Sequence, residues 1–380
     1  MSFFGQYMIR DYVYLYVEYS LNPMKKSLYL FITLLILLTG ITSCGDCPVS
    51  ENDTPYTFPK PSHFPSPSIP ADNPLTVNKI KLGRMLFYDK ALSEDQLISC
   101  ASCHKQQLAF ASDKALDTKV HGGTTKRNSM PLFNLVFSPN YFWDGRTNTL
   151  EATCLDALKD EQNFQEGYIK SRLFGRYDYK ELFKIVFNTE NPTEDMVAKC
   201  LASFIRTMIS ANSPVDRGVK EGNVNKYLSA QAQQGKILFE SEDGDCFHCH
   251  GAIQGLPQMT DNLFHNNGLD SVQDPSKYKD FGYGKVTGNA SDNSKMRTPA
   301  LRNLSYTKPF MHDGRIPNLD AVLEHYNRGV KLNVNIDVLM EKRFQGGINL
   351  DPVRTAQLKA YLLSFDDPDF ISDTAFSSPF

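Results

Sequence analysis

Several features that would point to other classes of protein are scarce in this sequence. Basic and acidic residues nearly balance, 40 against 43, for a formal net charge of −3, so the lysine and arginine surplus of nucleic-acid-binding domains is missing. Long alternating runs of β-branched residues, typical of half-buried strands, are also missing. Tryptophan occurs once, at Trp143, beside 25 phenylalanines and 18 tyrosines. We therefore expect a body that is not β-rich and no nucleic-acid partner.

The apolar run near the N-terminus, Leu28–Leu38, is shorter than the ~20 apolar residues that a membrane-spanning helix needs. Two lysines precede it and small residues follow it before Cys44, which is the order of parts in a secretion signal. We predict a signal peptide over residues 24–43, with residues 1–23 as an over-extended N-terminus. The small residue before Cys44 resembles a bacterial lipoprotein signal, in which that cysteine is lipidated; a plain cleaved signal is the alternative. The lipoprotein interpretation places the protein on the periplasmic side of a bacterial membrane, held by a lipid anchor only.

Residues 44–72 are rich in proline and serine and predict a linker without regular structure. We expect this linker to hold the body off the membrane as a semi-extended tether. In the body, apolar residues recur with a helical period over residues 193–210, and Asp351-Pro352 has the form of a capped helix start. The sequence therefore predicts a mainly α body with long irregular loops.

An internal repeat organises the body. The same parts occur twice in the same order: a helical stretch ending in Leu-Phe, a C-x-x-C-H motif, and an Asp-Gly-Arg turn followed by a helix that begins at a leucine. The paired stretches are residues 82–87 and 234–239, 100–104 and 246–250, and 143–146 and 312–315. We therefore predict two domains related by duplication, 73–225 and 226–380.

The C-x-x-C-H motifs predict two covalently bound c-type haems. The spacing puts two thiols on one turn, where they can add to the vinyl groups of one haem, and the adjoining histidine becomes the iron ligand. A zinc site would need four ligands from such a cluster, and a thioredoxin-like pair would need a βαβ context that is absent. The fold class expected is therefore a pair of cytochrome c-like haem domains. The predicted attachment residues are Cys100, Cys103 and His104 in the first domain, and Cys246, Cys249 and His250 in the second.

The helix after each Asp-Gly-Arg turn differs at one matching position. Tyr326 lies fourteen residues after His312, whereas Ala157 lies fourteen residues after Trp143. The duplication therefore predicts that one iron can be closed by a tyrosine while the other lacks a ligand from this helix. From the helix alone, a packed core tyrosine remains the alternative for Tyr326.

From about residue 73 to the C-terminus the motifs resemble the bacterial dihaem cytochrome c peroxidases and MauG. The resemblance implies that the first haem reacts with peroxide and that the second supplies its electrons. The stretches that carry it are LGRMLFYDKALS, ISCASCH, HGG followed by RN, FWDGR, FIRTMIS to SPVDR, CFHCHG, TDNLFHNNG, RTPALRNL and PFMHDGR.

The resemblance also implies roles for single residues. Trp143 matches the electron bridge between the haems, with a packed core tryptophan as the alternative. His121 matches a loop histidine that ligates the first iron at rest in many members, with an exposed loop histidine as the alternative. An inter-haem calcium ion would be held at Asn128, Thr307 and Pro309, with the oxygen ligands that this ion prefers. The distal ligand of the second iron would be Tyr326, with His325 and Met311 as local competitors.

The sequence departs from the family pattern over the first haem. Where the family has LEEQ and then NPxEM, Thr153 replaces the glutamine and Asn163 replaces the glutamate that acts as acid–base. Asparagine cannot transfer a proton in this way, and general acid–base help is typically worth ~10²–10⁴ in rate. Glu161 or Glu166 could substitute if the segment is reshaped. The sequence therefore predicts haem binding, but with Thr153 and Asn163 at these positions it does not predict efficient peroxidase turnover.

Three functions stay open from the sequence. The first is reduction of hydrogen peroxide with electrons from a small c-type cytochrome or similar donor. The second is MauG-like oxidation of a protein or small molecule, and the third is electron transfer without catalysis. A homodimer is left open, as is whether Cys154 and Cys200 form a disulfide or Cys154 is simply a small buried residue.

Overall fold

The computed structural model describes residues 53–251 and 257–380. The predicted N-terminal extension, the signal peptide, Cys44 and the first part of the linker lie outside these residues. Among the described residues, no helix is both long and apolar enough to cross a membrane.

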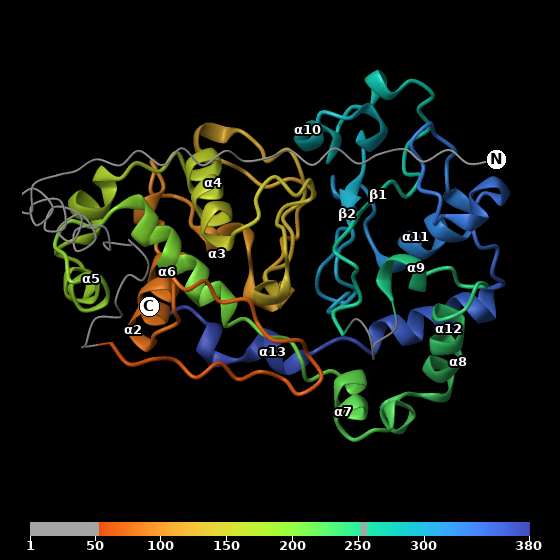
Figure 1. The fold of residues 1–380 in the computed structure, drawn as a ribbon, viewed down its shortest axis with the longest axis horizontal. Coiled ribbons are helices and arrows are strands. Elements are labelled where there is room, and N and C mark those ends of the chain that lie inside the picture. Colours follow the sequence, from red (N-terminus) through yellow and green to blue (C-terminus); the bar gives the residue numbers. More distant parts are fainter. Residues whose placement is uncertain (1–52, 252–256) are drawn as a thin grey trace, which may run out of the picture. The chain divides into compact units, whose positions relative to one another are not determined.

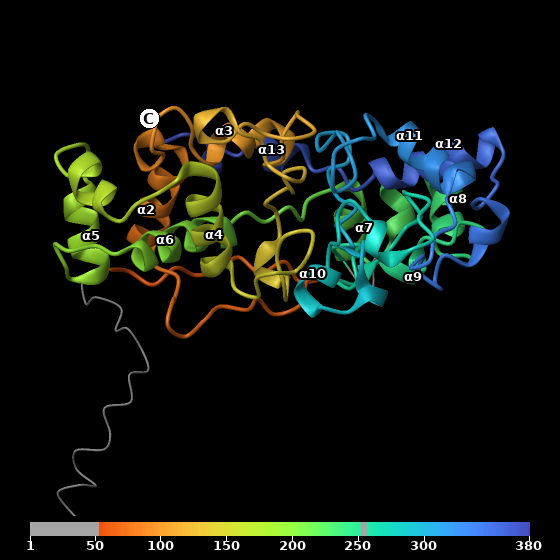
Figure 2. The same ribbon diagram turned by 90° about the horizontal axis from the view of Figure 1, so that it is seen from above.

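Helices and irregular segments make up the described chain (Figures 1 and 2), and the expectation of a mainly α fold with long loops is confirmed. The one named sheet pairs two short antiparallel strands. The elements are α2 (Val77–Tyr88), α3 (Cys100–Cys103), α4 (Leu150–Gln162), α5 (Tyr179–Phe187), α6 (Glu194–Arg206), α7 (Pro214–Lys220), α8 (Ala230–Phe239), α9 (Phe247–His250), β1 (Phe264–His265), α10 (Gly284–Thr287), β2 (Met296–Arg297), α11 (Leu319–Glu324), α12 (Pro352–Leu363) and α13 (Pro368–Ser372).

The helix starts expected from the sequence are present. Thr193 caps α6 by accepting a hydrogen bond from the Met196 backbone N–H, which satisfies one of the free donors at a helix start. Asp351 caps α12, which begins at Pro352, in the same way. The apolar face of α6 is buried between α2 and α4, as the helical period predicts.

Two hydrophobic cores lie along the chain. The first is built on α2, α4, α5 and α6, and the second on α8, α11 and α12. Each core contains one close helix crossing at a glycine: a side chain at Gly83 would overlap the Cys200 carbonyl of α6, and one at Gly235 would overlap the Gln357 carbonyl of α12. The repeated glycine of the two stretches thus lets the backbones of two helices meet in each core.

The Asp-Gly-Arg turns also repeat in structure. Gly145 and Gly314 have φ of +68° and +66°, a left-handed conformation that glycine adopts without cost. Antiparallel bridges close both turns, Tyr141 with Thr147 and Phe310 with Ile316. The two halves are therefore built to the same local plan up to the helix that follows each turn.

The proline-rich segment does not extend freely from the body as expected. Over residues 53–72 it contains no helix, as predicted, and most of its residues are exposed, but Asp53 and Phe64 are buried. Phe64 is 3% exposed and packs on Phe137, and the His63 imidazole is 2.7 Å from the Asp216 carboxylate of α7. The tether expectation fails here because apolar and hydrogen-bonding side chains between the prolines have partners on the body.

The C-terminal tail returns to the first core. Phe370 of α13 and Phe376 are buried among residues of that core, and Arg84 of α2 donates to the Ser377 carbonyl at 2.6 Å. The division into domains 73–225 and 226–380 stays a prediction of the repeat, since the tail of the second stretch completes the core of the first.

Candidate functional site

The first C-x-x-C-H motif opens on a large cavity. Ser99 and Ser102 form a capping box that starts the single turn of α3, so Cys100 and Cys103 lie one turn apart. Both thiols and His104 line a cavity of ≈ 350 Å³. The imidazole Nδ1 of His104 lies 2.8 Å from the Phe110 carbonyl, and a hydrogen bond there leaves Nε2 as the nitrogen that can bind a metal.

The second motif has the same arrangement in a second cavity of ≈ 220 Å³, lined by Cys246, Cys249 and His250. Nδ1 of His250 lies 2.8 Å from the Met259 carbonyl. Burial lowers the pKa of His250 to about 4, and burial also lowers the pKa of His104. Both imidazoles are therefore neutral at pH 7, which is the state that ligates a metal.

The residues around both motifs fit a c-type haem better than zinc. Each motif offers two thiols on one turn and a neutral, oriented imidazole facing a mostly apolar space, which is what thioether attachment and iron ligation need. Within the described ranges, no group of three or more potential metal ligands includes His104 or His250. Cys249 does lie near Asp261 and His265, but both nitrogens of His265 face carboxylates, of Asp337 at 2.7 Å and Asp261 at 2.9 Å.

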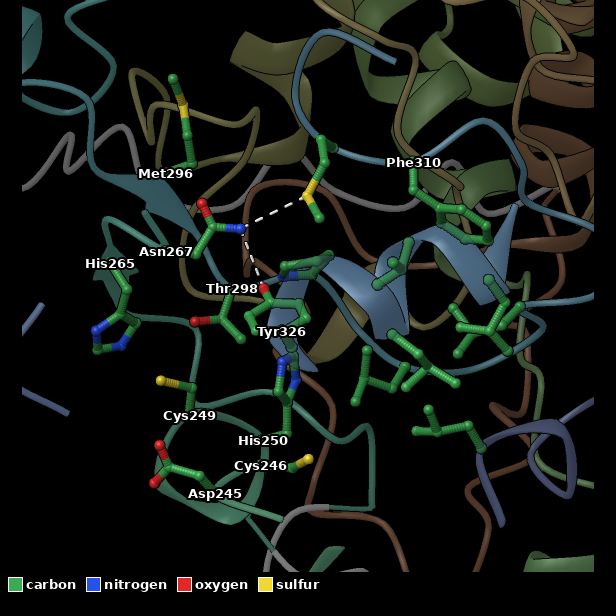
Figure 3. A pocket seen from close by; sticks show the side chains of 18 of the residues that line it. Asp245, Cys246, Cys249, His250, His265, Asn267, Met296, Thr298, Phe310 and Tyr326 are labelled. Atoms are coloured by element: carbon green, nitrogen blue, oxygen red, sulfur yellow. Dashed lines mark hydrogen bonds between the residues drawn. The ribbon is translucent and has the colours of Figure 1, made fainter. Parts of the chain in front are cut away.

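Tyr326 lies on the wall of the second cavity (Figure 3). It is in a π-type turn, His325–Gly329, that follows α11, and such turns often occur at functional sites. The phenol oxygen accepts a hydrogen bond from Asn267 Nδ2 at 3.1 Å, and the same amide is 3.5 Å from the Met311 sulfur. Burial raises the pKa of Tyr326 to about 12, so without a metal the phenol keeps its proton at neutral pH.

The competitors of Tyr326 differ in position. Met311 lines the second cavity together with Tyr326. His325 does not line it: its ring is buried, and Nε2 lies 3.1 Å from the Asn267 carbonyl. Of the three candidate ligands, Tyr326 with its oxygen and Met311 with its sulfur therefore line the second cavity.

The matching wall of the first cavity is the helix α4. Thr153, Ala157 and Glu161 lie four residues apart and line the cavity together, because this spacing puts side chains on one face of a helix. Ala157 offers no ligating atom, as the repeat predicts. The Thr153 hydroxyl is hydrogen-bonded within its own turn, to the Thr149 carbonyl at 2.8 Å and the Thr147 hydroxyl at 2.7 Å.

The structure does not bring Asn163 or His121 to this wall. Asn163 ends α4 in a left-handed conformation, is exposed, and donates through Nδ2 to the Glu94 carboxylate at 2.6 Å. The exposed His121 lies 2.5 Å from the same carboxylate through Nε2. Neither residue lines the cavity. The expected placement of Asn163 in the distal pocket is thus corrected: α4 continues to Gln162 and carries Asn163 past the cavity.

Trp143 lies where the two cavities approach each other. It lines both cavities, is 9% exposed, and donates from its indole Nε1 to the Asn128 carbonyl at 2.9 Å. Arg297 also lines both. These two side chains therefore belong to the walls of both cavities.

The residues expected to bind calcium share one cavity. Asn128, Thr307 and Pro309 all line the second cavity. The Asn128 amide donates to the Lys114 carbonyl at 2.9 Å, so its oxygen is the end left to face a cation. Their oxygen chemistry fits a hard ion such as calcium.

Cys154 and Cys200 are both free and buried. Cys154 lines the first cavity and Cys200 lies in α6 under Gly83. The disulfide left open by the sequence is not formed in this structure, and the alternative of small buried residues fits their surroundings.

Two features were not found from the sequence. Glu94 is the shared partner of Asn163 and His121, a contact between distant segments with no local signal. Arg297 reaches both cavities from β2, which depends on how the halves fold. The length of α4, in contrast, could be read from the sequence, because no proline or glycine interrupts the stretch from Leu150 to Gln162.

A mainly helical body with two C-x-x-C-H motifs, each facing its own cavity, defines a c-type cytochrome with two centres. A family model described as di-haem cytochrome c peroxidase matches residues 77–224. The cytochrome-c peroxidase IdrP1 of Denitromonas iodatirespirans is 32% identical over 299 residues, 72% of this chain and 78% of that protein. The methylamine utilization protein MauG of Methylophilus methylotrophus is 30% identical over 338 residues, 87% of this chain and 95% of that protein.

A solved structure is also similar to this chain. A MauG-like protein associated with microbial copper homeostasis has 27% sequence identity and a TM-score of 0.77, covering 85% of this chain and 99% of that one. The chain therefore belongs to the family of di-haem cytochrome c peroxidases and MauG. Membership implies two c-type haems and an oxidoreductase.

Proposed function

We propose that the protein reduces hydrogen peroxide to water with electrons from a small c-type cytochrome or a similar donor. The observation that carries this proposal is Trp143, which lines both cavities while each cavity has its own C-x-x-C-H motif. A path for electrons between two centres is needed when one centre receives them and the other uses them. The relatives named as cytochrome-c peroxidases support the same activity.

The haem-attachment residues would be those predicted from the sequence. Cys100 and Cys103 would attach the first haem with His104 as its ligand, and Cys246, Cys249 and His250 would hold the second. When bound, these haems supply the one-electron redox chemistry. The carbonyls of Phe110 and Met259 keep the imidazoles oriented.

The two cavities are proposed to have different tasks. Tyr326 lines the second cavity together with the second motif and would close that centre. That centre would then store and pass electrons. In the first cavity the matching residue is Ala157, and His121 is held outside by Glu94. The first centre would therefore stay open to peroxide.

A second candidate function is oxidation of a protein or small molecule by the same two centres. The observation that favours it is Tyr326, since an anionic oxygen ligand lowers the potential of its iron and stabilises high-valent states. The similarity to MauG proteins points in the same direction. Non-enzymatic electron transfer is disfavoured by the open wall of the first cavity.

The test is steady-state turnover of the purified dihaem protein. Mixed with peroxide and a reduced c-type cytochrome, it should oxidise the cytochrome in proportion to the peroxide added. Trp143→Phe should keep both haem spectra but slow this oxidation, whereas Tyr177→Phe, at an exposed aromatic lining neither cavity, should not. Absence of peroxide-dependent oxidation in the unmodified protein would contradict the proposal.

We further propose that calcium binds at Asn128, Thr307 and Pro309. A chelator should lower the thermal midpoint, and added calcium should restore it, because a ligand that binds only the folded state stabilises it. Unchanged melting in chelator, with no calcium found by elemental analysis, would contradict this site.

Export and anchoring through a lipid on Cys44 are proposed from the signal pattern alone. Fatty-acid labelling of the full chain in cells should be lost in Cys44→Ser. Labelling that persists in this variant would contradict the anchor.

A further inference from the structure

We propose that Glu161 is the proton-exchanging group of the first cavity, taking the place of the glutamate that the family pattern puts at Asn163. This inference rests on the proposed peroxidase function, because it names the residue that moves the proton in that reaction.

The first support is the face of α4. Leu150, Thr153, Ala157 and Glu161 all line the first cavity, and their spacing of three or four residues follows one side of a helix. Glu161 is thus two turns beyond Thr153 on the same side. It is partly buried, and no described residue donates a hydrogen bond to its carboxylate.

The second support is the continuous course of α4. The family pattern has Asn-Pro in this region, and proline ends a helix because it lacks the N–H and restricts the residue before it. Here the stretch from Lys159 to Gln162 has no proline or glycine, and α4 continues to Gln162. The extra turn brings Glu161 onto the cavity wall and leaves Asn163 bound to Glu94 outside it.

The third support is the charge around the carboxylate. Asp160 and Asp117 face it as anions, and Lys119 and Arg146 as cations. Both cations are already paired, Lys119 with Asp160 at 2.6 Å and Arg146 with Asp144 and Asp156. Burial first, and then the Asp160 charge, raise the pKa of Glu161 to about 7. A group with a pKa near the working pH both accepts and returns a proton well.

The proton balance of the reaction is simple. Glu161 accepts the proton from one oxygen of hydrogen peroxide and delivers it to the other oxygen, which leaves as water when the O–O bond breaks. Two reduced donor cytochromes supply one electron each, and two protons from solvent complete the second water. Overall, one peroxide, two electrons and two protons give two waters.

The experiment measures cyanide association as well as peroxide turnover. At pH 7 the probe is HCN, which must lose its proton to a base as cyanide binds at an open ferric haem. In the unmodified holoprotein the association rate should rise with pH through about 7. Glu161→Gln should lower that rate and kcat/KM for peroxide by about 10²-fold, and should remove the pH dependence.

Two further variants make the result specific. Glu161→Asp keeps an ionisable group and should keep a pH-dependent rate. Glu190→Gln removes a carboxylate of the same half whose side chain is 55% exposed, and should leave both measurements unchanged. Haem absorbance and thermal melting show whether each variant is folded.

The outcomes separate this inference from the proposed function. If Glu161→Gln binds cyanide at the original rate with the original pH profile, the inference is overturned even though peroxide turnover is present. If turnover is absent in the unmodified protein but cyanide binding still depends on Glu161, the peroxidase proposal fails and the proton-exchange role stands. If Glu166→Gln rather than Glu161→Gln shows the loss, the inference is wrong.

Discussion

At the scale of single residues, the two motif histidines, His104 and His250, have similar environments in their separate cavities. Each is buried, has a lowered pKa, and has its Nδ1 near a backbone carbonyl. The asymmetry between the centres therefore comes from the opposite walls, where Tyr326 faces one cavity and Ala157 the other. Under the proposed function, this one difference at a repeated position would give the two centres different tasks.

Replacing Tyr326 by phenylalanine tests this asymmetry. The variant removes the only oxygen donor among Tyr326, Met311 and His325, so the second haem should change its ligand spectrum and its reduction potential should rise. Resonance Raman spectra and a redox titration measure this, with Met311→Leu as the matched control on the same wall. Methionine or bis-histidine ligation of the second haem in the unmodified protein would show the assignment to be wrong.

At the scale of elements, each half depends on one close helix crossing. The glycines Gly83 and Gly235 occupy matching positions of the repeat, and each lies against a carbonyl of the partner helix. The crossing holds α2 on α6 and α8 on α12. The helices α2 and α8 precede the two motifs in sequence, and Phe87 of α2 and Phe239 of α8 line the first and the second cavity.

Gly83→Ala should therefore destabilise the protein, although alanine favours helices. The new methyl group overlaps the Cys200 carbonyl, and overpacking of this kind typically costs about 1–3 kcal/mol. Denaturant unfolding followed by circular dichroism measures the change. Gly167→Ala is the matched control, because a side chain there meets nothing within 4 Å; equal effects of the two substitutions would argue against the crossing.

At the scale of the whole described chain, two segments outside the core helices make long-range contacts. Residues 53–72 contact the body at two points far apart in sequence, through Phe64 on Phe137 and His63 on Asp216 of α7. The tail carries Phe370 and Phe376 from the second core back to the first. The cavities therefore depend on contacts between residues far apart in sequence.

Asp216 joins several segments that are far apart in sequence. It is fully buried and bound to the guanidinium of Arg302, to His63 and to Ser213. Burial opposes its ionisation, but Arg302 and these hydrogen bonds outweigh burial, so the pKa lies below its ordinary value. Its contribution to stability is therefore present above the ordinary carboxyl range and lost as the pH falls through the lowered pKa.

Asp216→Asn should cost about 3–5 kcal/mol, because it leaves a buried arginine without its counter-charge. The loss should appear in denaturant unfolding at pH 7 and shrink in strongly acidic buffer. Glu221→Gln, at an exposed ion pair just after the same helix, is the control and should change little. Similar small effects for both variants would contradict the role given to Asp216.

Much of the site followed from local pattern. The C-x-x-C-H spacing, the repeat, and the caps at Thr193 and Asp351 depend on neighbours in sequence, and so they could be predicted. The position of Asn163 could not be carried over from the family, because the course of α4 departs from the family pattern there. The docking of residues 53–72 was missed because proline content describes the local backbone and not the partners of His63 and Phe64.

The sequence by itself thus determined the class of the protein, its two centres, its mainly helical fold and the tyrosine–alanine asymmetry. These features depend on covalent spacing and periodicity, which are local. Only the tertiary structure decided that Trp143 lines both cavities, that Glu94 holds His121 and Asn163 outside, and that Glu161 faces the first cavity. These features depend on which segments, far apart in sequence, come into contact. The packing of side chains determines those contacts, and it is complete only when the whole chain has folded.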